Sequence, residues 1–198
     1  MRILRMGEHS VLVELDDPAA VRRLRAAALA AGIAREVVAG WRTLLLTGDG
    51  SPGQLAGQVE QLSTVTAAAV SGRHHEVPVH YDGEDLSAVA AACGLSEQDV
   101  VRLHSGATYD VVLLGFSRGF PYLAGLPQEL SLPRRATPRT RVPAGSVGIA
   151  LDQCGIYPMA SPGGWQLLGH TEHPVFDEQR EPPNLFDIGD TVHFFQVG

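Results

Sequence analysis

GFSRGFPYLAGLP (residues 115–127), LPRRATPRTRVPAGSVGIALDQCGIYP (132–158) and SPGGWQLLGHT (161–171) form an almost continuous stretch. A proline or a glycine stands near almost every bend of this stretch, with arginines and aromatic residues between the bends. Such punctuation favours short strands joined by rigid loops. Because binding groups are commonly placed on rigid loops, the stretch predicts both a β-rich fold and a binding site.

Strand-like segments extend this pattern to the end of the chain, and helical periodicity is absent after Tyr109. Many short strands with turn signals between them are typical of a closed or nearly closed β-barrel. The last strand follows Gly189-Asp190 and is expected to seal the barrel edge. The expected strands are Val111 to Phe116, Val147 to Leu151, Trp165 to Thr171 and Thr191 to Val197.

The first 75 residues read as a ββα unit that occurs twice. Asp17-Pro18 is expected to begin one helix and Ser51-Pro52 the other, with Gln54 completing a capping box. Alternating strand pairs and helices predict an α+β domain with helices on one face of a mostly antiparallel sheet. The expected strands are Ile3 to Met6, Val11 to Leu15, Val37 to Val38 and Leu44 to Thr47.

The polar segment SGRHHEVPV, residues 71–79, is the best candidate for a domain boundary. It predicts a small α/β domain over residues 1–75 and a β-barrel domain over residues 76–198. His74 and His75 fall in this presumed linker and are expected to be solvated. The other histidines are scattered without metal-ligand spacing, so no metal site is expected. His104 is expected at the end of a helix, where a protonated imidazole would be favoured.

Composition excludes several classes of function. The 198 residues carry a formal net charge of −7, which argues against nucleic acid as a partner. Every basic residue is an arginine, so the chain has neither a Schiff-base lysine nor a phosphate-binding P-loop. The GxSxG match at residues 115–119, GFSRG, lies in a stretch of expected strands and loops and lacks the helix that follows a nucleophile elbow. An activity on ATP or on an amide would therefore need a site completed by another chain.

The sequence also allows a prediction of the cellular compartment. Two cysteines do not make a disulfide framework, and the N-terminus lacks the apolar core of a signal peptide. The longest apolar runs are too short to cross a bilayer. We therefore expect a cytoplasmic protein that does not contact a membrane.

Four arginines, Arg134, Arg135, Arg139 and Arg141, lie close together in a loop stiffened by prolines. Guanidinium groups bind carboxylate or phosphate through two parallel hydrogen bonds, so the loop could be an anion clamp. Alternatively, it is a solvated basic loop, or its arginines form internal ion pairs with some of the 22 acidic residues. Both interpretations stay open from the residues alone.

The segment after this loop offers a second candidate site. Gly163 and Gly164 could let a ligand approach backbone N–H groups that form an anion nest, with Trp165 as a wall. The alternative is a tight turn into a strand whose Trp165 is core. Phe120 and Tyr122 are candidates for a pocket lining, whereas Phe116 is expected to pack inside the barrel.

Several motifs together carry a resemblance to a known family. They are GFxxGFPYLxGLP, PRRxxPRxxVPAGSVGIA, the GIYP turn, SPGGWQLLGHT and a terminal GDxVxF. These resemble the B-type subunit of 5-oxoprolinase, a family also known as allophanate hydrolase subunit 1, which includes Kip-type inhibitors of sensor kinases. The chain departs from the family pattern at Arg118, where proline is usual, and at Cys154, where threonine is more usual.

The resemblance implies an α+β N-terminal domain followed by a cyclophilin-like β-barrel. It implies ATP-dependent opening of 5-oxoproline to glutamate, with ATP and Mg used in the complex rather than held tightly by this chain. The implied partners are a C-type subunit of 5-oxoprolinase, which is an allophanate hydrolase subunit 2-type protein, and a LamB/YcsF-type protein as the A-type subunit. An alternative function is inhibition of a sensor histidine kinase. The expected site combines Arg134, Arg139 and Arg141 with a groove of Phe120, Tyr122, Tyr157 and Trp165, and an oxyanion site at Gly163 and Gly164.

Overall fold

The computed structural model describes residues 1–64 and 72–198 of the chain. Its contacts divide the chain into two compact units, Met1–Ser71 and Gly72–Gly198. The predicted boundary segment begins at Ser71, which lies outside the described residues.

The first unit contains a four-stranded antiparallel sheet with the strand order β1-β2-β4-β3. Each pair of strands is followed by a helix, so the predicted ββα repeat is confirmed at the level of elements. The elements are β1 (Arg2–Met6), β2 (Ser10–Glu14), α1 (Pro18–Ala31), β3 (Glu36–Ala39), β4 (Thr43–Thr47) and α2 (Pro52–Thr64).

Both helices begin at the capping residues that the sequence predicts. The Asp17 side chain accepts a hydrogen bond of 2.7 Å from the backbone N–H of Ala20. At the second helix, the Ser51 N–H donates to Gln54 Oε1 at 3.1 Å, and the Gln54 N–H donates to Ser51 Oγ at 3.4 Å. These reciprocal bonds satisfy N–H groups that an uncapped helix end would leave unpaired.

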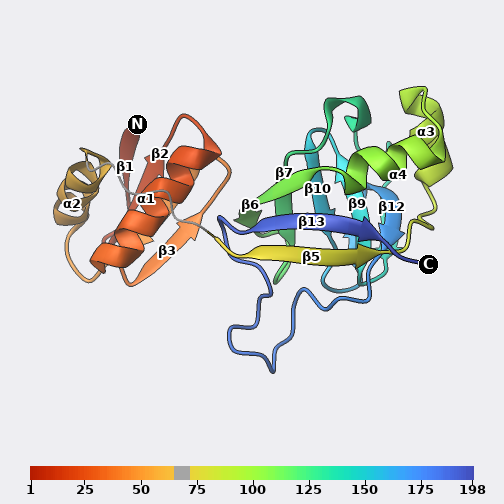
Figure 1. The fold of residues 1–198 in the computed structure, drawn as a ribbon. Coiled ribbons are helices and arrows are strands. Elements are labelled where there is room, and N and C mark those ends of the chain that lie inside the picture. Colours follow the sequence, from red (N-terminus) through yellow and green to blue (C-terminus); the bar gives the residue numbers. More distant parts are fainter. Residues whose placement is uncertain (65–71) are drawn as a thin grey trace. The chain divides into compact units, whose positions relative to one another are not determined.

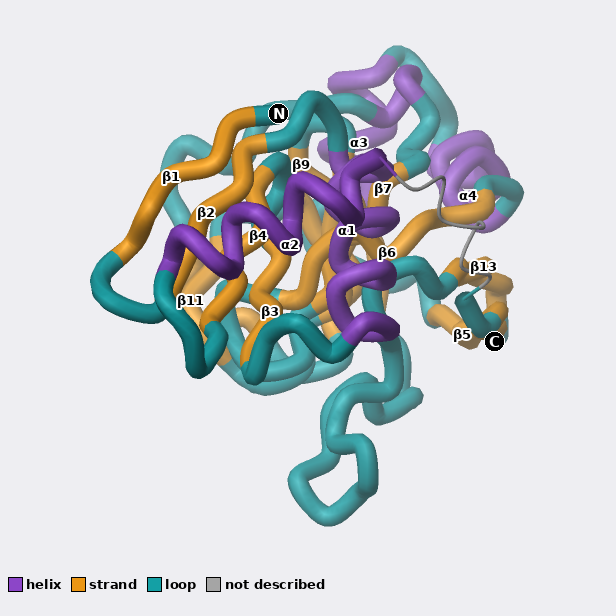
Figure 2. The backbone as a smooth tube through the Cα atoms, turned by 90° about the vertical axis from the view of Figure 1, so that its left-hand side faces the viewer, coloured by secondary structure: helices purple, strands orange, loops and turns teal. Residues whose placement is uncertain are grey.

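The two helices cover the same face of this sheet (Figure 2). Helix α1 contacts β3 and β4, and helix α2 contacts β1 and β2. Alternate residues of β2 and β4 point toward the helices and are buried, which gives these two strands the period-two pattern of a one-sided sheet. The buried core comprises Val11, Val13, Val21, Leu24, Ala28, Ala39, Leu44, Leu46, Leu55 and Val59.

The second unit is built on a seven-stranded sheet with the order β12-β9-β10-β7-β6-β13-β5. A separate two-stranded ribbon pairs β8 with β11, and α3 and α4 pack on the sheet at β12 and β13. The elements are β5 (His74–Val79), α3 (Leu86–Cys93), α4 (Glu97–Ser105), β6 (Thr108–Leu114), β7 (Pro121–Ala124), the 3₁₀ turn η1 (Gln128–Leu130), β8 (Arg139–Val142), β9 (Ser146–Ala150), β10 (Gln153–Ile156), β11 (Ser161–Gly163), β12 (Gln166–His170) and β13 (Thr191–Gln196).

The sheet curls into a half-barrel, and its two edge strands approach each other. His80 and His170 exchange backbone hydrogen bonds of 2.8 and 2.9 Å where β5 and β12 end. The last strand does not seal an edge, contrary to the prediction. Strand β13 lies inside the sheet between β6 and β5, and runs parallel to β5 (Figure 1). The reason is that the presumed linker is itself a strand.

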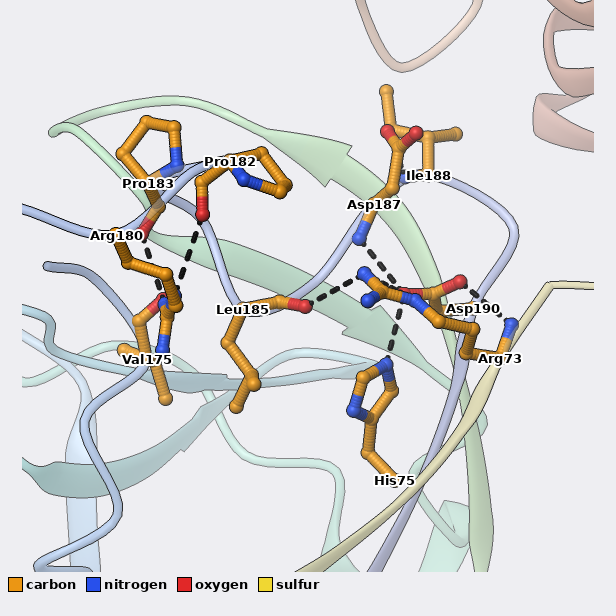
Figure 3. A network of polar contacts seen from close by, with 10 residues as sticks. All are labelled: Arg73, His75, Val175, Arg180, Pro182, Pro183, Leu185, Asp187, Ile188 and Asp190. Carbon is orange, nitrogen blue, oxygen red and sulfur yellow. Dashed lines mark hydrogen bonds and ion pairs between the residues drawn. The ribbon is translucent and has the colours of Figure 1, made fainter.

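The expectation that His74 and His75 are solvated linker residues is wrong for His75. Alternation along β5 turns this side chain inward, leaving it 12% exposed. Its Nε2 lies 2.9 Å from Oδ2 of Asp190, whose other oxygen accepts from the backbone N–H of Arg73 at 2.8 Å (Figure 3). This network ties the start of β5 to the start of β13.

The expectation for His104 is confirmed in position, since the residue lies in the last turn of α4, but it is wrong in charge state, because the side chain is fully buried. Its Nδ1 lies 2.8 Å from the Tyr81 hydroxyl, and its Nε2 lies 3.2 Å from Cys154 Sγ. Burial lowers the pKa of His104 to about 3, so the imidazole is neutral at pH 7. The ring is a hydrogen-bonded part of the core.

Candidate functional site

The arginine loop leads into the β8–β11 ribbon of the second unit. Arg139 is the first residue of β8 and pairs with Gly163 of β11. Arg134 and Arg141 are exposed, whereas Arg135 and Arg139 are partly buried. The loop therefore divides its arginines between a solvent side and an inner side.

The inner side is organised by a buried carboxylate, Asp85, whose side chain is 4% exposed. Oδ1 of Asp85 accepts hydrogen bonds from Arg135 Nη1 at 2.6 Å and from Arg139 Nη2 at 2.8 Å. Its Oδ2 accepts from the backbone N–H of Leu167 in β12 at 2.7 Å. One carboxylate thus joins the arginine loop to an edge strand of the sheet.

The charges of this cluster are mutually stabilised. Burial alone would raise the pKa of Asp85, but hydrogen bonds from Arg139 and Leu167 and the charges of the two arginines outweigh it and lower that pKa. The hydrogen bond to Asp85 raises the pKa of Arg139, against the opposing effect of burial. Arg139 Nε also donates to Glu84 at 3.1 Å. Asp85 is therefore ionised over the whole neutral range.

Of the three arginines predicted to hold an anion, Arg139 is engaged in internal ion pairs, the alternative considered for this loop. Arg134 and Arg141 form no ion pair with any other residue in the described ranges. Arg139 Nη1 and Arg135 Nε are buried without a hydrogen-bond partner there. The free positive charge of the loop thus lies on Arg134 and Arg141, beside a fixed pair of arginines.

The four rings predicted to wall a groove do come together. The Phe120 ring centroid lies 5.1 Å from that of Tyr122, 5.2 Å from that of Tyr157 and 5.5 Å from that of Trp165, all edge to face. Phe120, Tyr157 and Trp165 are at most 5% exposed, so they form a packed cluster. Tyr122 alone is partly exposed. In this arrangement the three buried rings support the loop from within, and only the Tyr122 ring is accessible to a ligand.

The paired glycines have different surroundings. A Cβ on Gly163 would lie 2.9 Å from two ring carbons of Tyr157, so glycine is required for this ring to approach the ribbon. A Cβ on Gly164 would come no closer than 3.6 Å to its nearest neighbour, Pro138. Neither glycine has a positive φ. The Gly164 carbonyl accepts a 2.8 Å bond from the Arg135 N–H and so helps to fix the loop.

Sequence reasoning missed Asp85 and its neighbour Glu84. Asp85 precedes the apolar helix α3 and looks like an ordinary helix cap, yet its side chain makes no capping bond. The only signal for it was the arginine loop itself, since buried arginines require an acidic partner. Which of the 22 acids fills that role depends on a contact across 50 residues of chain.

Two further observations concern residues 1–64 and 72–198. No helix within them is long and apolar enough to cross a membrane. No three histidine, cysteine, aspartate or glutamate side chains within them gather as metal ligands.

Comparison with known proteins identifies relatives along the whole chain. Residues 1–186 match the family described as carboxyltransferase domain, subdomain C and D. A 5-oxoprolinase B-type subunit from Haemophilus influenzae is 42% identical over 210 residues, which cover 100% of this chain and 99% of the relative. A 5-oxoprolinase B-type subunit from Escherichia coli O157:H7 is 57% identical over 62% of this chain and 57% of its own length.

Solved structures share the fold. A crystal structure of TTHA0988 superposes with a TM-score of 0.87 and 38% identity, covering 96% of this chain but only 40% of that chain. The urea carboxylase of Kluyveromyces lactis superposes with a TM-score of 0.71 at 21% identity, covering 99% of this chain and 22% of the enzyme. Both this chain and that segment are mixed α/β structures.

The similarity to the Haemophilus influenzae protein spans both compact units and the arginine loop. The predicted resemblance is thereby confirmed. This protein belongs to the family of 5-oxoprolinase B-type subunits, within the carboxyltransferase subdomain C and D family that matches residues 1–186.

Proposed function

We propose that this chain is the B-type subunit of a multi-subunit, ATP-dependent 5-oxoprolinase that opens 5-oxoproline to glutamate in the cytoplasm. The observation that carries the proposal is 42% identity over the full length to a protein of that name. The partners would be a C-type subunit, similar to allophanate hydrolase subunit 2, and a LamB/YcsF-type protein as the A-type subunit. No finding favours the alternative of a kinase inhibitor.

The proposal includes the architecture of the chain. Residues 1–75 would form a small α/β domain and residues 76–198 a cyclophilin-like barrel domain. The division of contacts near residue 71 supports the first part. The backbone bonds between His80 and His170, which bring the sheet edges together, support the second. The α+β arrangement of the first unit agrees with it.

The arginine loop would bind the substrate carboxylate or a phosphoryl group. Arg134 and Arg141 carry the unpaired charge, and Tyr122 lies at the exposed side of the ring cluster. Arg139 would be a positioning residue, since Asp85 already holds its guanidinium. Backbone amides near Gly163 and Gly164 would face the developing oxyanion. Phe120, Tyr157 and Trp165 would keep this ribbon rigid.

The site would be completed by another subunit. This chain covers only 40% of the TTHA0988 chain, which leaves room there for further domains. The sequence has no lysine, and no cluster of metal ligands occurs among the described residues. ATP with Mg would therefore be bound in the complex, with the partner supplying the ligands of the metal. We expect the chain to be inactive alone.

Co-expression tests this proposal. The chain, its C-type partner and its A-type partner are purified together, and ADP release and glutamate formation are measured with and without 5-oxoproline. We expect both products only from the complete complex with 5-oxoproline. A complex that forms but releases no additional ADP with 5-oxoproline would refute the assigned substrate.

The arginine loop is tested in the same complex. Arg134→Ala combined with Arg141→Ala should lower kcat/KM for 5-oxoproline by about tenfold or more, because a charge-assisted hydrogen bond is lost. Arg102→Ala is the matched control, since Arg102 is an exposed arginine of α4 in a simple pair with Asp99. Equal activity of the double variant and the control would remove the anion-binding role.

A further inference from the structure

A cavity lies in the second unit, outside the arginine loop. It is an open pocket of about 530 Å³ between the β6–β7 turn and the β12–β13 connection, the long loop seen in Figures 1 and 2. Small-molecule sites have volumes of roughly 300–1,000 Å³. Residues lining the pocket include Leu114, Ser117, Arg118, Phe176, Glu178 and Asn184.

The turn side of the pocket is fixed by its own backbone bonds. The Gly115 N–H donates to Phe120 O at 3.1 Å, and the Phe120 N–H donates to Ser117 O at 3.2 Å. Gly119 has a φ of +75°, and a Cβ there would lie 2.7 Å from the Cβ of Phe176. Glycine thus lets the Phe176 side chain pack directly against the turn.

The loop side is fixed as well. Phe176 and Asn184 form an antiparallel bridge at the base of the loop. Inside the loop, the Arg180 guanidinium donates to the carbonyls of Pro183 at 2.9 Å, Pro182 at 3.3 Å and Val175 at 3.5 Å (Figure 3). Two fixed walls make a preformed pocket, which lowers the entropy cost of binding.

Two polar groups on these walls lack partners. Ser117 Oγ is buried and has no hydrogen bond within the described residues. The side-chain amide of Asn184 likewise forms no hydrogen bond with another described residue. Because buried polar atoms are almost always bonded, the serine hydroxyl points to a partner that a ligand would supply.

The pocket also carries one charge of each sign. Arg118 Nη1 lies 2.9 Å from Glu178 Oε1, and the two side chains are 74% and 70% exposed. A pair this exposed contributes little net stability, so a ligand can open it readily. The guanidinium would then bind a carboxylate, and the glutamate would accept an N–H. Leu114 and Phe176 would contact the apolar part of the ligand.

We propose that this pocket binds a small carboxylic acid with an N–H group beside the carboxylate, the chemistry shared by α-amino acids and their lactams. The carboxylate contacts Arg118, the N–H group donates to Glu178, and further polar atoms contact Ser117 and Asn184. Binding is a property of this chain alone, so the inference does not depend on the function proposed above.

Calorimetric titration of the purified chain with three ligands, 5-oxoproline, L-proline and L-glutamate, tests this proposal. The controls are cyclopentanecarboxylate, which lacks the N–H, and 2-pyrrolidinone, which lacks the carboxylate. At least one ligand should bind about tenfold or more tightly than both controls. Preference for 5-oxoproline would connect the pocket to the lactam substrate, and preference for an amino acid would make it a separate site. No saturable binding, or equal binding of the controls, would overturn the proposal.

Two variants locate the binding. Arg118→Gln should weaken affinity about tenfold, whereas the matched exposed arginine variant Arg102→Gln should leave it unchanged. Ser117→Ala should weaken affinity without lowering thermal stability, because the hydroxyl has no partner in the ligand-free fold. Unchanged affinity in Arg118→Gln would place the ligand elsewhere and reject this pocket. If the complex is active on 5-oxoproline while the isolated chain binds none of the three ligands, the pocket alone is rejected.

Discussion

Asp85 is the residue on which the arginine loop depends, because it binds two guanidinium groups and one backbone N–H. Asp85→Asn should lower the free energy of unfolding at pH 7 by about 3 kcal/mol, the cost of removing one partner from a buried ion pair. The measurement is urea denaturation of both proteins.

The pH dependence of the free energy of unfolding separates the effect of losing the Asp85 charge from an effect on packing. The folded pKa of Asp85 is lowered, so its contribution is present above the unfolded pKa of about 3.9 and is lost as the pH falls through the folded pKa. The difference between wild type and Asp85→Asn should shrink in that acid range. A difference that stays constant down to the lowest pH would show that ionisation is not involved.

Among the elements, the β8–β11 ribbon contains a position that is sensitive to side-chain volume. Gly163→Ala should cost about 1–3 kcal/mol of stability, because the added methyl group collides with the Tyr157 ring. Gly164→Ala is the matched control, with its methyl group in ordinary contact with Pro138, and should change stability by less than about 0.5 kcal/mol. Thermal unfolding of both variants measures the contrast, and equal losses would contradict the packing argument.

Local signals explain which elements could be predicted from the sequence. Asp17 and Ser51 bond within three residues along the chain, so their helix starts were readable. Strand β5 was read as a linker because its partner, β13, is more than 100 residues away. The contact between Asp85 and Arg139 also joins distant parts of the sequence, 54 residues apart. Pairings of this kind depend on tertiary packing, which composition and spacing do not encode.

For the whole molecule, the buried His104 predicts a loss of stability in mild acid. Its folded pKa of about 3 is below the unfolded value of about 6.5, so the unfolded chain binds one more proton between these pH values. Stability of the second unit should therefore fall as the pH drops below about 6.5, by roughly 1.4 kcal/mol per pH unit from this group.

A variant that cannot bind a proton at position 104 should lose the pH dependence of stability that His104 causes. His104→Gln keeps a polar side chain but does not titrate, so its stability should vary less between about pH 6 and about pH 4.5, in the range above most carboxyl pKa values. Urea denaturation across this range measures both slopes. Parallel slopes in wild type and variant would assign the acid sensitivity to other groups.

The position of β13 between β5 and β6 also determines when the second unit can form during synthesis. Residues 74–79 gain their strand partner only after residues 191–196 have left the ribosome. Until then, the nascent chain has an unpaired strand and an incomplete sheet, states that expose apolar surface and favour aggregation. The first unit is different, since each of its strands pairs within residues 2–47. Its sheet can be complete while the second is still being translated.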